Sequence, residues 1–372
     1  MKRTTSSLTT RSDPPARDGR HRLVVGVDAG GTATRALVAT LSGERLGQAR
    51  SEGANPNAHG VDKAADRLAG AISDALDQAG PGARDAVAAG VVGLAGVSAL
   101  RDGIVRTRME RALSEAGLAP GRGFFTGDDE VAFASGTPSA HGTVLIAGTG
   151  AIATRIDDRR RTRSADGMGW LIGDEGSGFW MGHQAAKETA RQLSRGGELS
   201  PLARAVAKRV IPGQRPVDGD ASLFQEHARS FARTLTAAPP ILLAALAPLV
   251  SEAYAVGDPA AEVIVNAAAG HLAHSVHQVR NPGERLPVVL AGGVLSHSEP
   301  VRSALTRKLT LGTAGSEIVP AGCTVGGAAW LAALRTGVTD EDHAVHGAFT
   351  RVGVDGDRDG GADRDRDRTD AA

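Results

Sequence analysis

Short runs rich in valine, leucine and isoleucine alternate with longer helical patterns through most of the 372-residue chain. Such runs, bounded by glycine and polar residues, predict buried β-strands, and the longer patterns have the apolar spacing of amphipathic helices. Alternating strands and helices indicate an α/β architecture, because each helix must cover a face of a sheet. The predicted strands are 23–28, 34–40, 86–93, 143–147, 151–156, 287–291 and 316–319, and the stretch from about 177 to 280 is predicted to be all helix.

Two glycine-containing segments of the chain are similar at a spacing of 120 residues. Residues 27–35 and 147–155 are identical at four of nine positions, with Gly30 aligned to Gly150. In each segment a strand enters a Gly/Thr turn and a second strand leaves it. We therefore predict an internal duplication, in which two similar halves form a cleft with a phosphate-binding turn on each wall.

Three glycine turns follow predicted strands. Glycine allows positive φ and lets backbone N–H groups face a phosphate without a Cβ in the way. Asp28 ends the strand before the first turn, and its carboxylate suits Mg²⁺, which prefers oxygen ligands. Each turn also has a structural interpretation, as an ordinary hairpin or as close strand–helix packing. The turn residues are Gly30, Gly31 and Thr32, then Gly148, Thr149 and Gly150, and finally Gly292 and Gly293.

Two acidic clusters are candidate catalytic or binding groups. Asp128 and Asp129 follow a strand end and begin a predicted helix, so one of them can simply cap that helix. A carboxylate at the carboxyl end of a strand also points into the crevice of an α/β sheet. The second cluster, at 167–180, combines glycines and tryptophans with two adjacent acids, the first of which is Asp174. This mixture suits a polyhydroxylated ring, and the structural alternative is a helix that starts at Asp174.

Composition and known motifs argue against several classes of protein. The 42 basic and 42 acidic residues give no net charge, which argues against a nucleic-acid partner. None of the five lysines lies in a Walker A loop, and the first glycine turn leads into a strand, which disfavours a Rossmann site. The single cysteine excludes an intramolecular disulfide framework and fits a reducing cytoplasm. The N-terminus lacks the apolar core of a secretory signal, and the longest apolar run, 237–250, is too short to span a bilayer, so no membrane partner is expected.

Taken in order, these residues resemble the BadF/BadG/BcrA/BcrD-type ATPases and, within them, the N-acetylglucosamine kinases, a branch of the actin, hexokinase and Hsp70 superfamily. The sharpest motif is Gly-Asp-Glu-Gly-Ser at 173–177 with a Gly-x-Gly at 167–169 upstream. The resemblance implies two ribonuclease H-like α/β domains around a central cleft, with a helix-rich insertion in the second. The expected divisions are a disordered extension at 1–20, domains at 21–137 and 138–350, and a disordered charged tail at 351–372.

The resemblance also implies cofactors and residue roles. ATP and Mg²⁺ would be the cofactors, and a small-molecule sugar would be the substrate. Asp28 would organise Mg²⁺, and Asp128 would be the catalytic base, with Asp129 as the alternative. The first two glycine turns would hold the phosphates, and Gly292 and Gly293 would lie by the adenosine. The sugar would be bound by Asn55, Gly167, Met168, Gly169, Asp174 and Ser177.

The expected reaction is ATP-dependent phosphorylation of the 6-hydroxyl of an amino sugar, first of all N-acetylglucosamine. Glucosamine, N-acetylmuramate and other hexose derivatives are alternatives, because Ala151 and Ile152 stand where family members often carry polar residues. An ATP-driven activator of a dehydratase or reductase is disfavoured, since Cys323 alone would have to bind the shared iron–sulfur cluster. A sugar-responsive regulator would need a DNA-binding module, for which residues 1–20 are too short. A homodimer is a further expectation.

Overall fold

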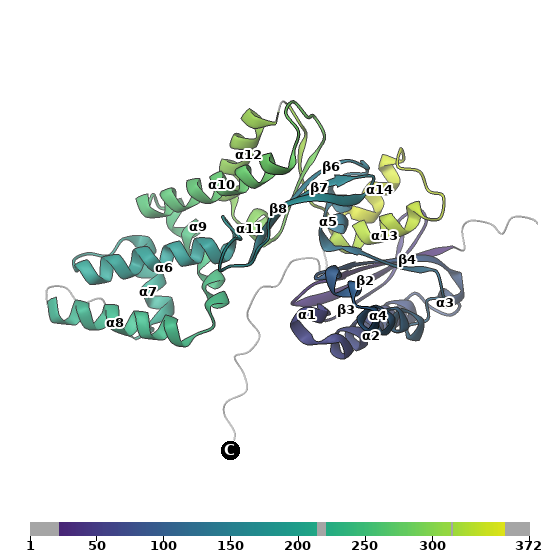
Figure 1. Ribbon diagram of the computed structural model, residues 1–372, viewed down its shortest axis with the longest axis horizontal. Coiled ribbons are helices and arrows are strands. Elements are labelled where there is room, and N and C mark those ends of the chain that lie inside the picture. Colours follow the sequence, from purple (N-terminus) through teal and green to yellow (C-terminus); the bar gives the residue numbers. More distant parts are fainter. Residues whose placement is uncertain (1–21, 214–220, 314, 354–372) are drawn as a thin grey trace, which may run out of the picture.

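The computed structural model describes residues 22–213, 221–313 and 315–353, and its first half is built on a five-stranded mixed sheet (Figure 1). The strand order is β3-β2-β1-β4-β5. The first three strands form an antiparallel meander, and β4 and β5 extend the sheet in parallel with β1. The strands are β1 (Leu23–Ala29), β2 (Ala33–Thr40), β3 (Arg45–Glu52), β4 (Val87–Leu94) and β5 (Gly123–Gly127).

The second half repeats this topology. Its sheet has the order β10-β9-β6-β7-β8, in which three antiparallel strands are again extended by two parallel ones. The two matching sheets confirm the α/β class and the two ribonuclease H-like halves. The strands are β6 (Gly142–Ala147), β7 (Ala151–Asp157), β8 (Arg160–Asp166), β9 (Val288–Ala291) and β10 (Ile318–Pro320).

The predicted alignment of the two hairpin turns is wrong by two residues. The ends of β1 and β6 lie 118 residues apart, and so do the starts of β2 and β7. Gly30 therefore corresponds to Gly148 rather than to Gly150. Glycine, alanine and threonine recur so often in both turns that chance identities favoured the wrong register.

Helices cover both faces of each sheet. In the first half, α2 packs on β2 and β3 and contacts α4, while in the second half α10 packs on β6, β7 and β8. α5 joins the halves and lies against β6 and β9. The helices of the first half and the connection are α1 (Pro56–His59), α2 (Val61–Gln78), α3 (Ala83–Ala86), η2 (Val97–Arg101), α4 (Gly103–Glu115) and α5 (Asp128–Gly136).

The stretch predicted to be helical at 177–280 forms the helix-rich insertion, whose helices lie at the left of Figure 1. It is followed by β9, two helices, β10 and two C-terminal helices. The insertion consists of α6 (Gly178–Arg195), α7 (Pro201–Val210), α8 (Ala221–Ala237), η3 (Pro240–Leu246), α9 (Ala247–Ala255) and α10 (Pro259–Val279). The later helices are α11 (Gly293–His297), α12 (Glu299–Gly312), α13 (Thr324–Leu334) and α14 (His343–Thr350).

α13 follows the second sheet in sequence but packs on the first. Gly26 in β1 allows its close approach, because a Cβ there would lie 2.3 Å from the carbonyl oxygen of Val325 and 2.4 Å from the backbone nitrogen of Ala329. The side chain of Trp330 is fully buried in the same core. The predicted domain boundary between residues 137 and 138 follows sequence position and does not include this return of α13 to the first sheet. It stays a prediction.

The edge strands β3 and β8 were missed as separate strands by the sequence prediction. β3 and β8 lie at the outer edges of the two sheets. The first five residues of β8, Arg160–Ser164, are all exposed. An edge strand with a solvated face has no continuous apolar run, which is the pattern that marks a buried strand.

The expected disordered ends, 1–20 and 351–372, lie outside the described residues except for 351–353. Within the described ranges, no single helix is long and apolar enough to cross a membrane. One strongly bent pair, Phe224–Ala237 with Pro240–Ala255, meets the criteria of length and composition alone.

Candidate active site

The first glycine turn connects β1 to β2 and is open to solvent. Gly31 and Thr32 are exposed. The N–H of Gly30 closes the turn by donating to the carbonyl oxygen of Ala33 at 3.0 Å. A Cβ at Gly31 would meet no atom within 4 Å, so a ligand has access to the backbone on that side. The turn therefore has room for a phosphate group.

Asn55 is placed beside this turn by the segment that follows β3. A Cβ at Gly53 would lie 2.1 Å from the carbonyl oxygen of Gly31, so this segment packs directly on the turn. Gly96 lies against Asn55, because a Cβ at Gly96 would be 2.7 Å from its Oδ1. The sequence analysis missed Gly96. The signal that could have found it is its position just after β4, since parallel strands end at one edge of a sheet.

Asp28 and Asp128 are brought together at the same edge of the first sheet. Asp28 is half-buried, accepts a hydrogen bond from the hydroxyl of Thr324, and lies 4.0 Å from the guanidinium of Arg35. Asp128 is the first residue of α5. Burial, together with repulsion from the carboxylates of Asp129 and Asp28, raises the pKa of Asp128 to about 6. The strand register places both residues at this edge, because Asp28 pairs with Gly93 of β4, and Gly93 pairs with Thr126, two residues before Asp128.

The structure distinguishes Asp128 from its neighbour Asp129. Asp129 is only 2% exposed, and its carboxylate lies 3.3 Å from the guanidinium of Arg161 in β8. The carboxylate of Glu130 accepts the N–H groups of Gly127 and Arg161 at 3.1 and 2.8 Å. These contacts tie the start of α5 to β8. Asp128 is half-buried, and no ion pair to it occurs within the described part of the chain.

The second glycine turn packs against the start of α6. The N–H groups of Gly178 and Phe179 donate to the carbonyl oxygens of Gly148 and Thr149 at 2.8 and 3.1 Å. These bonds satisfy two N–H groups of the first helical turn, which have no partner inside a helix. The side chain of Thr149 is exposed and accessible to a ligand.

Asp174 is held against the second turn. Its Oδ1 accepts the N–H of Ala151 at 3.2 Å, and a Cβ at Gly150 would lie 2.8 Å from its Oδ2. The φ of Asp174 is 58°, a left-handed conformation that is uncommon for residues other than glycine. Asp166 holds this conformation by accepting the N–H of Asp174 at 2.6 Å. Burial raises the pKa of Asp174. Asp166, which the sequence analysis missed, could have been found as the acid directly before the Gly-x-Gly motif.

The other predicted sugar ligands in this loop differ in accessibility. Met168 is 69% exposed, and a Cβ at Gly169 would meet no atom within 4 Å. Gly167 instead packs closely on the side chain of Ile152. Ser177 is buried, and its hydroxyl caps α6 by accepting the N–H of Trp180 at 3.2 Å. The helix therefore starts after Ser177, not at Asp174, and a contact between Ser177 and a sugar stays a prediction.

Gly292 and Gly293 lie next to the second turn. Gly292 follows β9 with a φ of 94°, and a Cβ there would lie 2.4 Å from the carbonyl oxygen of Ala147. A Cβ at Gly148 would lie 3.8 Å from the backbone nitrogen of Gly293. The second and third glycine turns are therefore close enough to contact one nucleotide.

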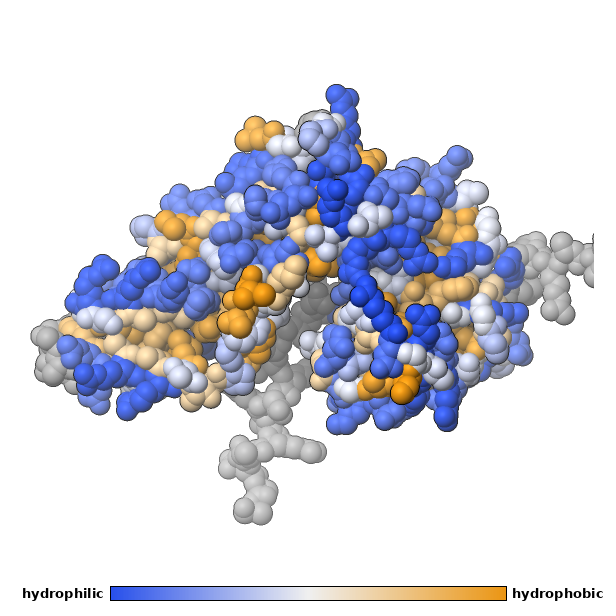
Figure 2. All heavy atoms as spheres, in the orientation of Figure 1, coloured by the Kyte–Doolittle hydropathy of each residue, from blue (hydrophilic) through white to orange (hydrophobic). Residues whose placement is uncertain are grey.

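The predicted site residues thus form two groups, one on each half of the molecule. Figure 2 shows the surface hollowed between the halves, and the segment from β8 to α6 lies on the side that faces the first half (Figure 1). α5 joins the groups: Asp128 begins it, and Gly136 at its end packs against Val289 of β9. α5 therefore connects the two groups of predicted site residues.

The donor set fits Mg²⁺ held together with a nucleotide. In the described residues, no three His, Cys, Asp or Glu side chains cluster as a metal site. Mg²⁺ is usually bound by one or two carboxylates, with water and phosphate oxygens as the other ligands. Asp28, beside Asp128 and the first glycine turn, provides such a carboxylate.

Two halves of identical strand order, each with a glycine turn after its first strand, define an actin-like ATPase fold. The chain belongs to the BadF/BadG/BcrA/BcrD ATPase family, whose model matches residues 25–332. This match confirms the family resemblance found in the sequence.

Three relatives illustrate the similarity. An N-acetylmuramic acid/N-acetylglucosamine kinase of Clostridium acetobutylicum is 28% identical over 181 residues, which are 49% of this chain and 58% of that protein. The match thus spans little more than half of that curated relative. A structure from Chromobacterium violaceum, provisionally named N-acetylglucosamine kinase, is 28% identical with a TM-score of 0.63, over 84% of this chain and 99% of that one. A structure from Porphyromonas gingivalis with the same provisional name is 20% identical with a TM-score of 0.60, over 85% and 100%, and it supports the fold alone.

Proposed function

We propose that this protein is an ATP-dependent kinase that phosphorylates the 6-hydroxyl of an amino sugar, with N-acetylglucosamine as the first candidate. The observation that carries the proposal is Asp128, a half-buried carboxylate with a pKa of about 6, near Asp28 at the end of the strand that leads into the first glycine turn. A group with such a pKa can accept a proton near neutral pH. The names of the two relatives at 28% identity support an amino sugar as the acceptor.

In the proposed reaction, Asp128 takes the proton of the 6-hydroxyl as that oxygen attacks the γ-phosphorus of ATP, and ADP leaves as the bond to the bridging oxygen breaks. Backbone N–H groups of the first two glycine turns orient the phosphates and stabilise the charge that develops on them. Mg²⁺ held at Asp28 would neutralise negative charge on the phosphates. Asn55 and Asp174 would orient the ring so that its hydroxyl reaches Asp128.

The activator alternative gains no support from Cys323. This cysteine is 4% exposed and lies at the N-cap position of α13. A cluster shared between two subunits requires thiols at a surface. The buried position of Cys323 therefore argues against this cysteine as a ligand of a shared cluster.

An acceptor panel tests the proposal. N-acetylglucosamine, N-acetylmuramate, glucosamine and glucose would each be incubated with the protein, Mg²⁺ and ATP, with ADP release measured by a coupled assay and the product identified by mass spectrometry. We expect ADP release that depends on an amino sugar, and fragmentation that places the phosphate at the 6-position. Product formed from none of the four sugars would contradict the proposal.

The rate of the proposed reaction should depend on pH through Asp128. Because its pKa is about 6 and the base must be deprotonated, kcat/KM for the sugar is expected to fall about tenfold per pH unit below that value. Initial rates from about pH 4.5 to 8 at constant ionic strength would measure the profile, with circular dichroism to confirm that the protein stays folded. A rate unchanged across this range would exclude Asp128 as the base.

Asp174→Asn should weaken sugar binding without affecting ATP. The substitution preserves size but removes the charge of the carboxylate that Gly150 and Ala151 hold in place. Loss of a charge-assisted hydrogen bond is expected to lower kcat/KM for the sugar by about 10- to 100-fold and leave KM for ATP within a factor of about 2. Steady-state kinetics with each substrate varied would measure both. Glu175→Gln at the exposed neighbouring position is the matched control, and an equal loss there would point to a general disturbance of the loop.

The remaining expectations stay predictions. These are a homodimer, a cytoplasmic location and the absence of nucleic-acid and membrane partners.

A further inference from the structure

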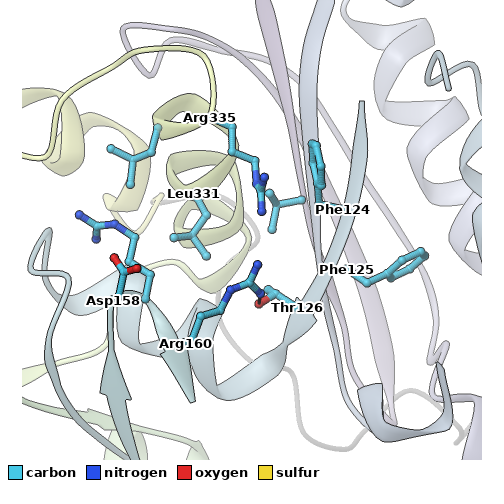
Figure 3. Close-up of a pocket in the computed structure, with 10 residues that line it drawn as sticks. Phe124, Phe125, Thr126, Asp158, Arg160, Leu331 and Arg335 are labelled. Carbon is cyan, nitrogen blue, oxygen red and sulfur yellow. Dashed lines mark hydrogen bonds between the residues drawn. The ribbon is translucent and has the colours of Figure 1, made fainter. Parts of the chain in front are cut away.

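A second pocket, of about 220 Å³, lies apart from the three glycine turns. Its walls come from both halves: β4 and β5 of the first sheet, the turn between β7 and β8 of the second sheet, and the end of α13 (Figure 3). None of the residues predicted to bind ATP or sugar lines it. The proposed kinase reaction gives this pocket no role.

Arg335 contributes a positive charge to this pocket. Its guanidinium stacks on the ring of Phe124 at 3.8 Å, and in the described part of the chain it has no ion-pair partner. Burial and the nearby charge of Arg160 lower the pKa of Arg335. A guanidinium stays protonated despite such a shift, so Arg335 contributes a positive charge that no ion pair among the described residues neutralises.

The turn between β7 and β8 places two more arginines at the pocket. Asp158 and Arg159 have φ values of 50° and 60°, which are unusual for residues other than glycine. Arg159 is neutralised by Asp340 at 2.7 Å, whereas Arg160 has a longer contact of 3.7 Å with Glu130. Arg160 is therefore the second guanidinium in the pocket that can still donate hydrogen bonds to a bound anion.

We propose that this pocket binds a small organic phosphate, with the phosphate group between Arg160 and Arg335. Figure 3 shows these two side chains reaching toward each other, while Asp158 lies on the opposite side of the pocket. Two guanidinium groups from different elements suit a doubly charged anion, because each can donate two parallel hydrogen bonds. Leu331 and Leu334 line the pocket as well and would contact the carbon skeleton.

The size of the pocket limits the ligand. Its volume of about 220 Å³ is below the 300–1,000 Å³ typical of sites for drug-sized molecules, so a ligand of a few carbon atoms fits. Since the walls come from both halves, a bound anion would link the β7–β8 turn to α13. Binding is therefore expected to favour one relative placement of the halves.

Calorimetric titration of the full-length protein with glycerol 3-phosphate tests the proposal. Saturating Mg²⁺ and a non-hydrolysable ATP analogue would fill the nucleotide site first. We expect saturable binding at one site per chain, weakened at least tenfold in Arg335→Gln. The matched control is Arg111→Gln in α4, at an arginine that is 71% exposed and is not among the residues that line the pocket, and it should bind as the wild type does.

Further variants and ligands test whether Arg335 binds the phosphate group. Circular dichroism of Arg335→Gln would verify its fold, and Arg335→Lys, which preserves charge but not the planar stacking group, should show an intermediate loss. Inorganic phosphate, titrated in parallel, should bind more weakly than glycerol 3-phosphate, since it lacks the apolar contacts. No saturable binding up to about 10 mM, or equal weakening by Arg335→Gln and Arg111→Gln, would overturn the proposal.

Discussion

Asp128→Asn is expected to lower kcat by about 100- to 10,000-fold and, at pH 7.5, to raise the free energy of unfolding. The loss in rate follows because an amide cannot take the proton of the attacking hydroxyl, and general-base catalysis typically contributes a factor of this size. The gain in stability follows because a charged Asp128 is costly in its half-buried place beside Asp28 and Asp129. Initial rates and urea unfolding of the same preparation would measure both effects.

The stability effect has a defined pH dependence. The pKa of Asp128 is about 6 in the folded protein against 3.8 for an ordinary aspartate. This difference corresponds to about 3 kcal/mol at most, because each pH unit is worth about 1.4 kcal/mol. The folded wild type binds the proton more tightly, so it recovers this stability as the pH falls from about 6 toward 4. The gain in Asp128→Asn should therefore be full above about pH 6 and vanish below about pH 4.

Asp129→Asn is the matched control, and the opposite result is expected. It removes the partner of Arg161 from a buried position, which should lower the free energy of unfolding by about 1–3 kcal/mol. The proton acceptor at position 128 remains, so kcat should stay within about threefold of the wild type. If Asp129→Asn lost the activity and Asp128→Asn retained it, the base would have to be reassigned to Asp129.

Gly26→Ala is expected to destabilise the protein by about 3 kcal/mol or more. A Cβ at position 26 would lie 2.3 Å from the carbonyl oxygen of Val325 and 2.4 Å from the backbone nitrogen of Ala329. Both are backbone atoms of α13, so no side-chain rotation relieves the overlap. α13 would have to move away from β1, and the fully buried Trp330 would lose contacts. Urea or thermal unfolding would measure the effect.

Gly70→Ala offers the same change in chemistry with the opposite expected sign. Gly70 lies inside α2, is exposed, and a Cβ there would meet no atom within 4 Å. Alanine in the interior of a helix is favoured over glycine by about 0.5–1 kcal/mol, so this variant should be slightly more stable than the wild type. Equal destabilisation by both substitutions would show that close packing of α13 on β1 is not the cause.

Most of the fold could be predicted from local patterns. Buried strands such as β1, β6 and β9 have continuous apolar runs, and the start of α5 was predicted from its acidic residues. The edge strands β3 and β8 were missed because β3 has one exposed face and β8 is exposed over its first five residues, so neither has a continuous apolar run. The two hairpin turns were aligned with an error of two residues, because small residues repeat within each turn.

The candidate site could be predicted only in part. Asp28, Asp128 and Asp174 were found because each is an acid next to a strand end or a glycine turn. Gly96 and Asp166 were missed because their importance comes from what they touch, Asn55 in one case and the N–H of Asp174 in the other. The hydroxyl of Thr324 donates a hydrogen bond to Asp28, which lies 296 residues away in sequence, and no local sequence pattern predicts this contact.

The amino-acid sequence alone was enough to predict an α/β protein with two similar glycine turns. The patterns of strands, helices and turns depend on residues that are neighbours in sequence. Folding decided which of two adjacent aspartates is bound to an arginine and which stays available, and it placed α13 on the first sheet. It also brought Arg160 and Arg335 to one pocket. Burial and electrostatic repulsion act through space. The raised pKa of Asp128 therefore depends on distant segments that pack around it, and it could not be predicted from the neighbouring sequence.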